Sequence, residues 1–226
     1  MANKARIKEL AKELNLQALT VKEIEELNMG NLDYLELILE QEVESRKQNA
    51  IARIKSSANL PSLAFEKERL NQGLQYQIDK LIDCSWIEES KNLLITGECG
   101  SGKTALASYL ANKAIEKGYK AYYTKLDELL IVAKGKDASS KAVATFNRIK
   151  NADMLVLDEM LYLNIASVDL ELLYRTLMLV NETTSIVFVT NREVSEWLET
   201  AEEKYTMQLL INRAIANTEV IRLQNA

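Results

Sequence analysis

One eight-residue segment constrains the fold of this chain more than any other. Residues 97–104 read GECGSGKT, a G-x-x-x-x-G-K-[ST] pattern between an apolar run and a helix-forming segment. Glycines let the backbone curl so that successive N–H groups face phosphate oxygens, and the following helix adds its positive N-terminal end. The segment predicts a phosphate-binding loop made by Gly97, Glu98, Cys99, Gly100, Ser101, Gly102, Lys103 and Thr104.

Three side chains of this loop have separate interpretations. Lys103 is expected to reach the β- and γ-phosphates of a nucleotide, and the Thr104 hydroxyl to ligate magnesium. Cys99 is interpreted as a loop filler, with redox control of nucleotide binding as the alternative.

The segment after Pro61 alternates short apolar runs with helix-length stretches, which is typical of strand-helix units around a parallel sheet. We therefore predict an α/β fold with five parallel strands and covering helices. The expected strands are residues 92–96, 120–124, 154–157, 185–190 and 219–223. The expected helical segments are residues 103–117, 125–150 with two helices, 167–181 and 194–217.

Two acidic residues follow the apolar run that reads MLVL, and they are Asp158 and Glu159. The carboxyl ends of parallel strands lie on the same edge of the sheet as the phosphate loop, so Asp158 can hold magnesium directly or through water. Glu159 can polarise an attacking water molecule. The pattern alone also fits an exposed strand end, but the single strand-helix unit between Lys103 and these acids favours the functional interpretation.

An asparagine, Asn191, ends the apolar run that reads SIVFVT. A neutral amide at that position can hydrogen-bond a γ-phosphate or orient water without competing for magnesium. The alternative is a turn residue at the end of a strand.

Composition removes several classes of chemistry. The 226 residues include no histidine and two cysteines, which excludes histidine bases, Ser-His-Asp sites and a disulfide framework. A net charge of -5 gives no global positive field, so any contact with DNA is expected to be a local patch. We find neither a secretory signal nor an 18-residue apolar stretch, and we expect a cytoplasmic protein without membrane contact.

The only proline, Pro61, marks the expected domain boundary. We predict a helical N-terminal domain over residues 1–60 and an ATPase domain over residues 61–226. In the first, Thr20 and Glu23 form a capping box for a short helix ending near Gly30, and Asn31 is expected to cap a long helix.

Several motifs in order resemble one protein family. They read CSWI, NLLITGECGSGKTALASYLANKAIEKGYKAYYTKLDELL, NADMLVLDEM, SIVFVTNREVSEW and QLLINRA, after a basic lead-in ESRKQNAIARIKSSANLP. This series is similar to IstB, the transposition helper ATPase of insertion sequences, which is kin to the DnaC and DnaI helicase loaders in the AAA+ class. The resemblance implies an AAA+ core, ATP and Mg²⁺ as cofactors, and a homo-oligomeric spiral on double-stranded DNA. It also implies deformation of that DNA and recruitment or stimulation of a partner transposase.

The resemblance also carries residue roles. It gives the Walker A roles to Lys103 and Thr104, the Walker B roles to Asp158 and Glu159, the sensor 1 role to Asn191, and the arginine finger to Arg213. A surface helix arginine is the alternative for Arg213. Asn212 stands where the family usually has aspartate, and we find no arginine segment for a sensor 2 role.

Six cations are candidates for contact with the DNA backbone. Their alternative role is solvated surface charge. They are Arg46, Arg53 and Lys55 in the lead-in, and Lys134, Lys136 and Lys141 in the middle of the second domain.

Three rival functions use the same phosphate loop. A helicase loader would bind a replicative helicase through its N-terminal helices. A small-molecule kinase would need a substrate lid, and no arginine-rich lid segment is present. A regulatory module would bind ATP and hydrolyse it very slowly.

Overall fold

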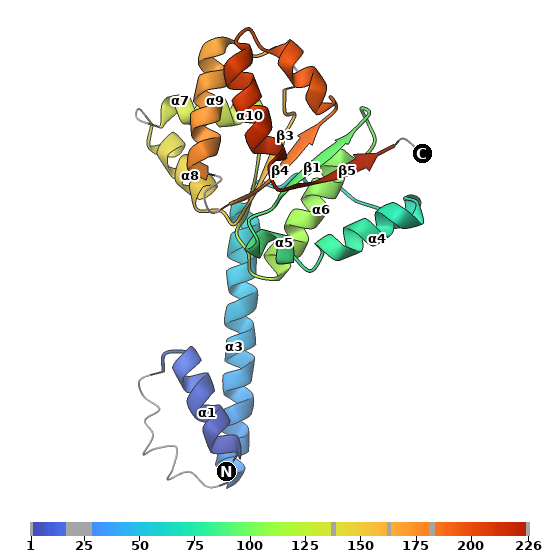
Figure 1. Ribbon diagram of the computed structural model, residues 1–226. Coiled ribbons are helices and arrows are strands. Elements are labelled where there is room, and N and C mark those ends of the chain that lie inside the picture. Colours follow the sequence, from blue (N-terminus) through green and yellow to red (C-terminus); the bar gives the residue numbers. More distant parts are fainter. Residues whose placement is uncertain (1, 17–28, 137–138, 162–163, 181–183, 225–226) are drawn as a thin grey trace. The chain divides into compact units, whose positions relative to one another are not determined.

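Five parallel strands form the centre of the computed structural model, which describes residues 2–16, 29–136, 139–161, 164–180 and 184–224. The strands follow the order β2-β3-β4-β1-β5 (Figure 1). The predicted α/β fold is confirmed, and each strand begins and ends within one residue of its predicted apolar run. The strands are β1(Asn92–Gly97), β2(Ala121–Lys125), β3(Met154–Asp158), β4(Ser185–Thr190) and β5(Thr218–Leu223).

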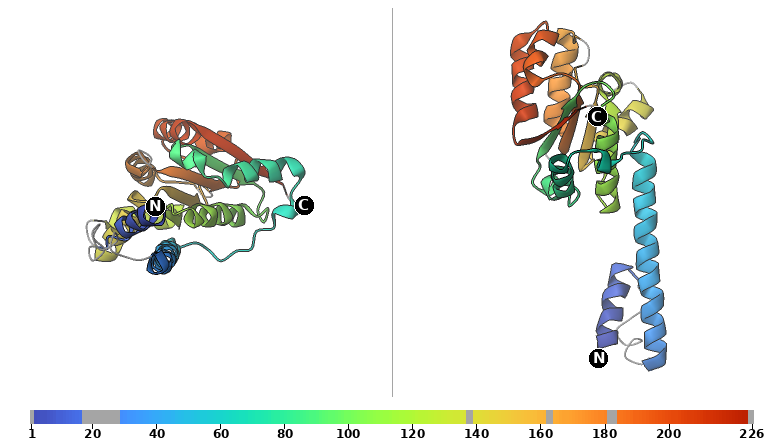
Figure 2. Two further views of the ribbon diagram at one scale, coloured as in Figure 1. Left: turned by 90° about the horizontal axis from the view of Figure 1, so that it is seen from below. Right: turned by 90° about the vertical axis from the view of Figure 1, so that its right-hand side faces the viewer.

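Helices cover both faces of this sheet, which explains why β1, β3 and β4 are buried along almost their whole length and mainly apolar. One helix, α6(Lys103–Glu116), begins directly after the phosphate loop and packs against β1, β2, β3 and β4. The other face is covered by helices that also contact one another (Figures 1 and 2). They are α7(Leu126–Gly135), α8(Ser140–Lys150), α9(Ser167–Val180) and α10(Lys204–Ile215).

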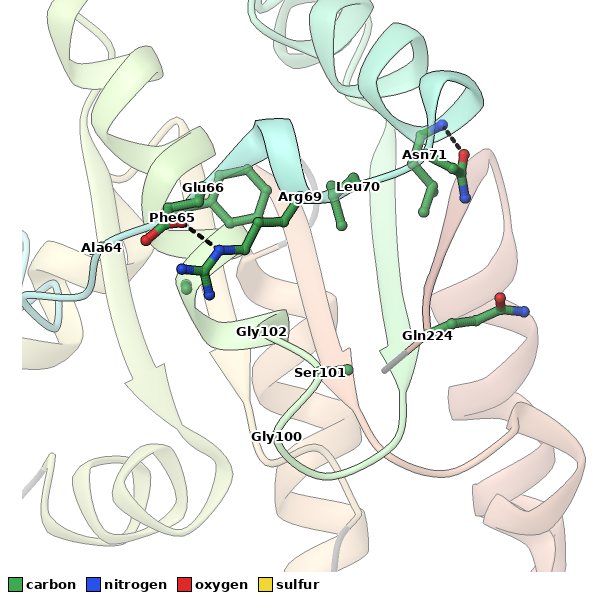
Figure 3. A pocket seen from close by; sticks show the side chains of 12 residues that line it. Ala64, Phe65, Glu66, Arg69, Leu70, Asn71, Gly100, Ser101, Gly102 and Gln224 are labelled. Carbon is green, nitrogen blue, oxygen red and sulfur yellow. Dashed lines mark hydrogen bonds and ion pairs between the residues drawn. The ribbon is translucent and has the colours of Figure 1, made fainter. Parts of the chain in front are cut away.

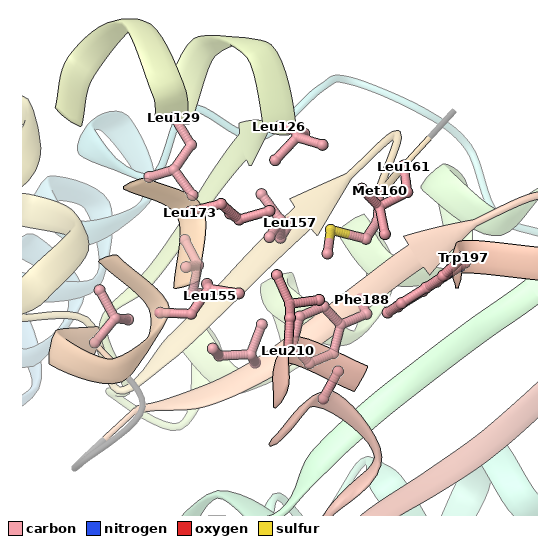
Figure 4. Packing of buried hydrophobic residues seen from close by; sticks show 14 of the residues in the cluster. Leu126, Leu129, Leu155, Leu157, Met160, Leu161, Leu173, Phe188, Trp197 and Leu210 are labelled. Carbon is pink, nitrogen blue, oxygen red and sulfur yellow. The ribbon is translucent and has the colours of Figure 1, made fainter. Parts of the chain in front are cut away.

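The largest apolar cluster lies between the sheet and this second group of helices. Leu155 and Phe188 contribute to it from β3 and β4, while Leu173 and Leu210 contribute from α9 and α10 (Figure 4). Because side chains alternate along a strand, Val156 and Asp158 of β3 point to the opposite face, where α6 lies. Asp158 is therefore directed to the helix that follows the phosphate loop.

Two parts of the second half differ from the sequence prediction. Residues 194–217 were expected to form one helical segment, but they form a 3-10 helix, η2(Val194–Thr200), and the separate helix α10. The break has a local cause, because the Glu203 carboxylate accepts hydrogen bonds from the N–H groups of Tyr205 and Thr206 and so begins a new helix. The elements η1(Lys67–Arg69), α4(Gln72–Leu81) and α5(Ser85–Glu88) were not predicted.

The N-terminal helices are α1(Ala2–Glu13) and α3(Met29–Ser57). They share a small apolar cluster in which Ile7, Leu10 and Leu32 are fully or almost fully buried. The long helix was predicted, but it already begins at Met29, so Gly30 and Asn31 lie inside it and do not form a stop and a cap. The capping box of Thr20 and Glu23 lies outside the described residues.

The chain divides into two compact units, Met1–Arg53 and Ile54–Ala226. The predicted domain boundary, between residues 60 and 61, falls inside the second unit, and it stays a prediction. Among the described residues, the structure has no helix with the length and apolarity that crossing a membrane requires.

Removal of the Phe188 ring tests the role of the large apolar cluster. Phe188 is 1% exposed, so Phe188→Ala leaves a cavity and lowers the free energy of unfolding by about 3 to 5 kcal/mol. Val168→Ala is the control, because Val168 is 76% exposed and its loss costs at most about 0.5 kcal/mol. Urea denaturation followed by tryptophan fluorescence measures both, and equal midpoints for the two variants would contradict the assignment.

Candidate functional site

The phosphate loop connects β1 to α6 and depends on glycine for its path. Gly100 and Gly102 have φ angles of 81° and 88°, a region that side chains disfavour. Gly102 is the N-cap residue of α6, so the last turn of the loop leads directly into the helix. The loop therefore presents its backbone and the N-terminal end of α6 to the same space.

Gly97 has a further constraint, which comes from the last strand. A Cβ atom on Gly97 would lie 2.2 Å from the carbonyl oxygen of Leu223, at the end of β5. The two strands are paired in register at this point. Glycine is thus required where β5 closes against the start of the loop.

Lys103 is folded back over its own loop. Its Nζ donates hydrogen bonds to the carbonyl oxygens of Gly97 and Glu98, at 2.8 and 2.6 Å. Partial burial lowers the pKa of Lys103 from its ordinary value. The ammonium group is held at the mouth of the loop by neutral acceptors only, and phosphate oxygens are stronger partners for it.

Asp158 is the most connected side chain of the site. Its Oδ2 accepts hydrogen bonds from Thr104 Oγ1 and from the Tyr123 hydroxyl, each at 2.8 Å. Its Oδ1 accepts a hydrogen bond from the backbone N–H of Glu159 at 2.7 Å. Asp158 is only 4% exposed, so these three donors compensate for the burial of its charge.

Sequence reasoning did not find Tyr123. Burial and the hydrogen bond to Asp158 raise its pKa above the ordinary value, so the phenol keeps its proton and donates. The position follows from strand pairing, because Tyr123 of β2 lies beside Val156 of β3, and both strands end on the same edge. The contact between Tyr123 and Asp158 can be recognised only once the pairing of β2 with β3 is known.

Glu159 is exposed, in contrast to the neighbouring Asp158, which is buried. It has a φ angle of 55°, and its Oε1 forms a 2.7 Å ion pair with Nζ of Lys125. The hydrogen bond and charge of Glu159 raise the pKa of Lys125. Lys125 was not predicted either, although it is two residues beyond Tyr123 on the same strand face.

Asn191 follows β4 directly, and the end of that strand is tied to the loop after β3. Thr190 Oγ1 donates to the carbonyl oxygen of Met160 at 2.9 Å, and the Met160 N–H donates to the Val189 carbonyl oxygen at 2.9 Å. These bonds hold the two strand ends side by side. Asn191 is thereby placed beside the two acidic residues.

A cavity of about 380 Å³ brings the predicted residues together. It lies at the carboxyl edge of the sheet, where parallel α/β folds place their ligands. Its lining consists of Cys99, Gly100, Lys103, Thr104, Asp158, Glu159 and Asn191.

A second cavity, of about 420 Å³, is also lined by Gly100 and continues along the phosphate loop. Part of its wall comes from the segment that precedes β1, including Phe65, Arg69 and Leu74, and Gln224 closes it after β5 (Figure 3). The Phe65 ring packs on the Tyr109 ring of α6, with centroids 5.1 Å apart. Sequence reasoning missed this wall, since nothing in the segment marks it as part of a site.

The residues present fit a nucleotide with magnesium. Hydroxyl and carboxylate oxygens are ligands that magnesium prefers, and Thr104 and Asp158 already lie in contact. The Ser101 Oγ is buried in the loop and has no hydrogen-bond partner among the described residues. The apolar and polar groups of the second cavity suit the remainder of a nucleotide.

Arg213 does not line either cavity. It is half-buried on α10, in the last turn of that helix. The structure therefore does not bring Arg213 to the nucleotide site of its own chain.

The candidate DNA-binding cations have varied surroundings. Arg46 is bound to Glu42 and to the Leu14 carbonyl oxygen, and Lys134 pairs with Asp169. Lys136 lies over the Phe146 ring, 5.4 Å from its centroid. The remaining three are exposed, and they are Arg53, Lys55 and Lys141.

Gly97→Ala tests the close approach of β5 to the loop. We expect a lower melting temperature and an ATP affinity reduced roughly tenfold or more, equivalent to at least about 1.4 kcal/mol, because the new Cβ collides with the Leu223 carbonyl group. Gly118→Ala is the control, since Gly118 has a φ angle of 94° but no atom within 4 Å of an added Cβ. It should cost stability only, so equal ATP affinities in the two variants would refute the argument.

Two solved structures share the fold of about three quarters of this chain. The DnaC helicase loader superposes with a TM-score of 0.57 at 20% identity, over 74% of this chain and 96% of that chain. AMPPCP-bound DnaA from Aquifex aeolicus superposes with a TM-score of 0.57 at 17% identity, over 73% of this chain and 51% of that chain. At such identities the likeness shows the fold.

Sequence relatives point to one family. A putative ATP-binding protein of an IS21-like insertion sequence in Bacteroides fragilis is 29% identical over 206 residues, which cover 89% of this chain and 78% of that protein. The putative ATP-binding protein of insertion sequence IS21 in Pseudomonas aeruginosa is 24% identical over 197 residues, covering 85% of this chain and 74% of that protein. A family model described as IstB-like ATP binding protein matches residues 1–226, and this chain therefore belongs to the family of IstB-like ATP-binding proteins.

Proposed function

We propose that this protein is a magnesium-dependent ATPase that assembles on duplex DNA when it binds ATP, deforms that DNA, and recruits or stimulates a partner transposase. One observation supports the ATPase part above all. A single cavity gathers a lysine and a hydroxyl from the phosphate loop, two acids from the end of β3 and an amide from the end of β4. The relatives, which are ATP-binding proteins of insertion sequences, support the transposition part.

ATP is held by the loop and by both cavities in this proposal. The phosphates lie along the loop, with the γ-phosphate toward Asp158 and Glu159 and the nucleoside in the cavity lined by Phe65 and Leu74. Lys103 exchanges its two loop carbonyl partners for phosphate oxygens. That exchange replaces neutral acceptors with charged ones and so favours binding.

Magnesium is held by Thr104 and Asp158, whose oxygens are 2.8 Å apart. The chemistry that the bound ion supplies is neutralisation of charge on the phosphate oxygens. The three hydrogen bonds to Asp158 fix the direction of its carboxylate before any ligand arrives.

Glu159 is the general base in this proposal. It orients a water molecule, whose oxygen attacks the γ-phosphorus as the bond to the β-phosphate oxygen breaks, and it takes the proton that the water releases. Only Oε1 of Glu159 is paired with Lys125, and the side chain is exposed, so the carboxylate can contact water while the ion pair is formed. Asn191 is the second group that orients the water or contacts the γ-phosphate.

Arg213 acts on a neighbouring subunit in this proposal. It lies away from the lining of its own cavity, so a role at the γ-phosphate requires a second copy of the chain. In a head-to-tail arrangement, each subunit would place its Arg213 at the ATP site of the next. If successive subunits are related by a rotation with a translation along the axis, the assembly is a spiral. ATP then stabilises the assembly by joining two subunits, and hydrolysis loosens it.

DNA contact in the proposal depends on assembly. A single chain carries a net charge of -5, and two of the six candidate cations are paired with carboxylates. Lys55, Lys136 and Lys141 are the better candidates, because no carboxylate partner is seen for them among the described residues. Repeated along a spiral, a few such cations for each subunit can track the DNA backbone. A cytoplasmic location is part of the same proposal.

The helicase loader is the competing function. Its support comes from likeness to DnaC and DnaI at 20% and 19% identity, which reaches no further than the fold. Preference for single-stranded DNA together with binding to a helicase would favour it.

Two substitutions separate ATP binding from hydrolysis. We expect Lys103→Ala to abolish both ATP turnover and ATP-dependent assembly on linear duplex DNA, because the phosphates lose their cation. We expect Glu159→Gln to abolish turnover and keep assembly, since the amide occupies the same space without accepting a proton. Phosphate release measures ATP turnover. Electron microscopy with ATP, ADP or no nucleotide measures assembly on duplex DNA. Normal assembly by the Lys103 variant would refute the ATP switch.

A mixing experiment tests Arg213. Arg213→Ala subunits keep an intact ATP site but cannot supply the arginine to a neighbouring subunit. Glu159→Gln subunits supply Arg213 to a neighbour but have an inactive ATP site. Each variant alone should turn over ATP slowly, and a mixture should recover part of the activity through the complementary interfaces. Activity of the mixture equal to the average of its two components would show that Arg213 does not act across subunits.

A further inference from the structure

We propose that Tyr123 is a positioning residue for the magnesium site, because its hydroxyl group fixes the direction of the Asp158 carboxylate. The proposal rests on the proposed function, in which Asp158 and Thr104 hold the ion. It adds a residue on β2 that acts through Asp158 and does not itself touch magnesium or ATP.

The hydrogen-bond donors are distributed over both oxygens of the Asp158 carboxylate. Oδ1 receives the Glu159 N–H, whereas Oδ2 receives both the Thr104 and the Tyr123 hydroxyl groups. Thr104 has a second duty, since it is itself a magnesium ligand in the proposed function. Tyr123 has no such duty, so its hydrogen bond constrains Oδ2 whichever way Thr104 turns. With both oxygens held, the carboxylate has little freedom to rotate.

The strand that carries the Tyr123 phenol is held along both of its edges. At the outer edge of β2, the Tyr123 N–H donates to the Ala58 carbonyl oxygen at 2.8 Å. Asn59 Nδ2 donates to the Tyr123 carbonyl oxygen at 3.1 Å. On the inner side, β2 pairs with β3 and places Tyr123 beside Val156. Both backbone groups of Tyr123 are thus bonded on the outer side, and the strand that carries it is paired with β3 on the inner side.

Both partners of this hydrogen bond are buried. Tyr123 is 7% exposed and Asp158 is 4% exposed, so water does not readily replace the phenol as a donor. A partner that orients a metal ligand from the outer shell typically changes metal affinity about 10- to 100-fold when it is removed. The Tyr123 hydroxyl matches this description, because it contacts the ligand and lies outside the coordination sphere.

Tyr123→Phe tests the proposal, because it deletes the hydroxyl and keeps the ring. The binding of a fluorescent ATP analogue is measured while magnesium is titrated, and again in excess EDTA. The magnesium concentration at half-saturation should rise roughly tenfold, whereas affinity in EDTA should stay within about twofold. The split between the two conditions separates positioning from a general loss of structure, which would weaken both.

Tyr122→Phe is the matched control. Tyr122 is the preceding residue of the same strand, 8% exposed, and its ring lies in the apolar cluster on the opposite face of the sheet. Its variant should keep the wild-type dependence on magnesium. If the Tyr123 and Tyr122 variants behave alike, or if the Tyr123 variant loses affinity equally with magnesium and with EDTA, the proposal is overturned.

Asp158→Asn separates the positioning role of Tyr123 from the proposed magnesium site on which that role depends. A large rise in the magnesium requirement of that variant supports Asp158 as the magnesium carboxylate. If Asp158→Asn raises the requirement and Tyr123→Phe does not, only the positioning role fails. If Asp158→Asn has no effect on the magnesium requirement, the proposed metal site itself fails. Melting temperatures without nucleotide verify that each variant is folded.

Discussion

The Asp158 carboxylate is the point at which the functional end of this fold is held together. It is buried, and its donors come from three different elements: the start of α6, the strand β2 and the loop that follows β3. A buried charge that lost these partners would destabilise the edge of the sheet, because its desolvation would no longer be compensated. The same hydrogen bonds set the direction of the group that is proposed to hold magnesium. Structural stability and readiness for the ligand therefore have a common physical source at this position.

The chemistry that is local in sequence was predictable, and the chemistry that depends on strand pairing was not. The phosphate loop and the pair Asp158 and Glu159 were found because each is a short pattern next to an apolar run, and the cavity at the sheet edge contains them. Tyr123 and Lys125 carry no such pattern. They contact the two acids only because β2 pairs with β3 in the register that sets Lys125 beside Asp158. The break between η2 and α10 was missed for a related reason, since one carboxylate, that of Glu203, caps the new helix.

The two acids of the site are held in opposite ways, and this separates their roles. Asp158 is buried and bound by neutral hydroxyl and backbone donors, which leave its charge available to a cation. Glu159 is exposed, and one of its oxygens, Oε1, is paired with the Lys125 ammonium group. An exposed ion pair contributes little to stability, so opening it costs little. The arrangement fits the two proposed roles, a fixed carboxylate for magnesium at Asp158 and a solvent-accessible base at Glu159.

The edge of the sheet next to this site is closed by the segment that follows α3. Ala58 and Asn59 bind the backbone of Tyr123, so they occupy hydrogen-bonding groups that an edge strand otherwise leaves open. Ala58 follows Ser57, the last residue of α3, without an intervening loop. The residue that follows α3 and the Asp158 carboxylate are thus connected through Tyr123 by two hydrogen bonds.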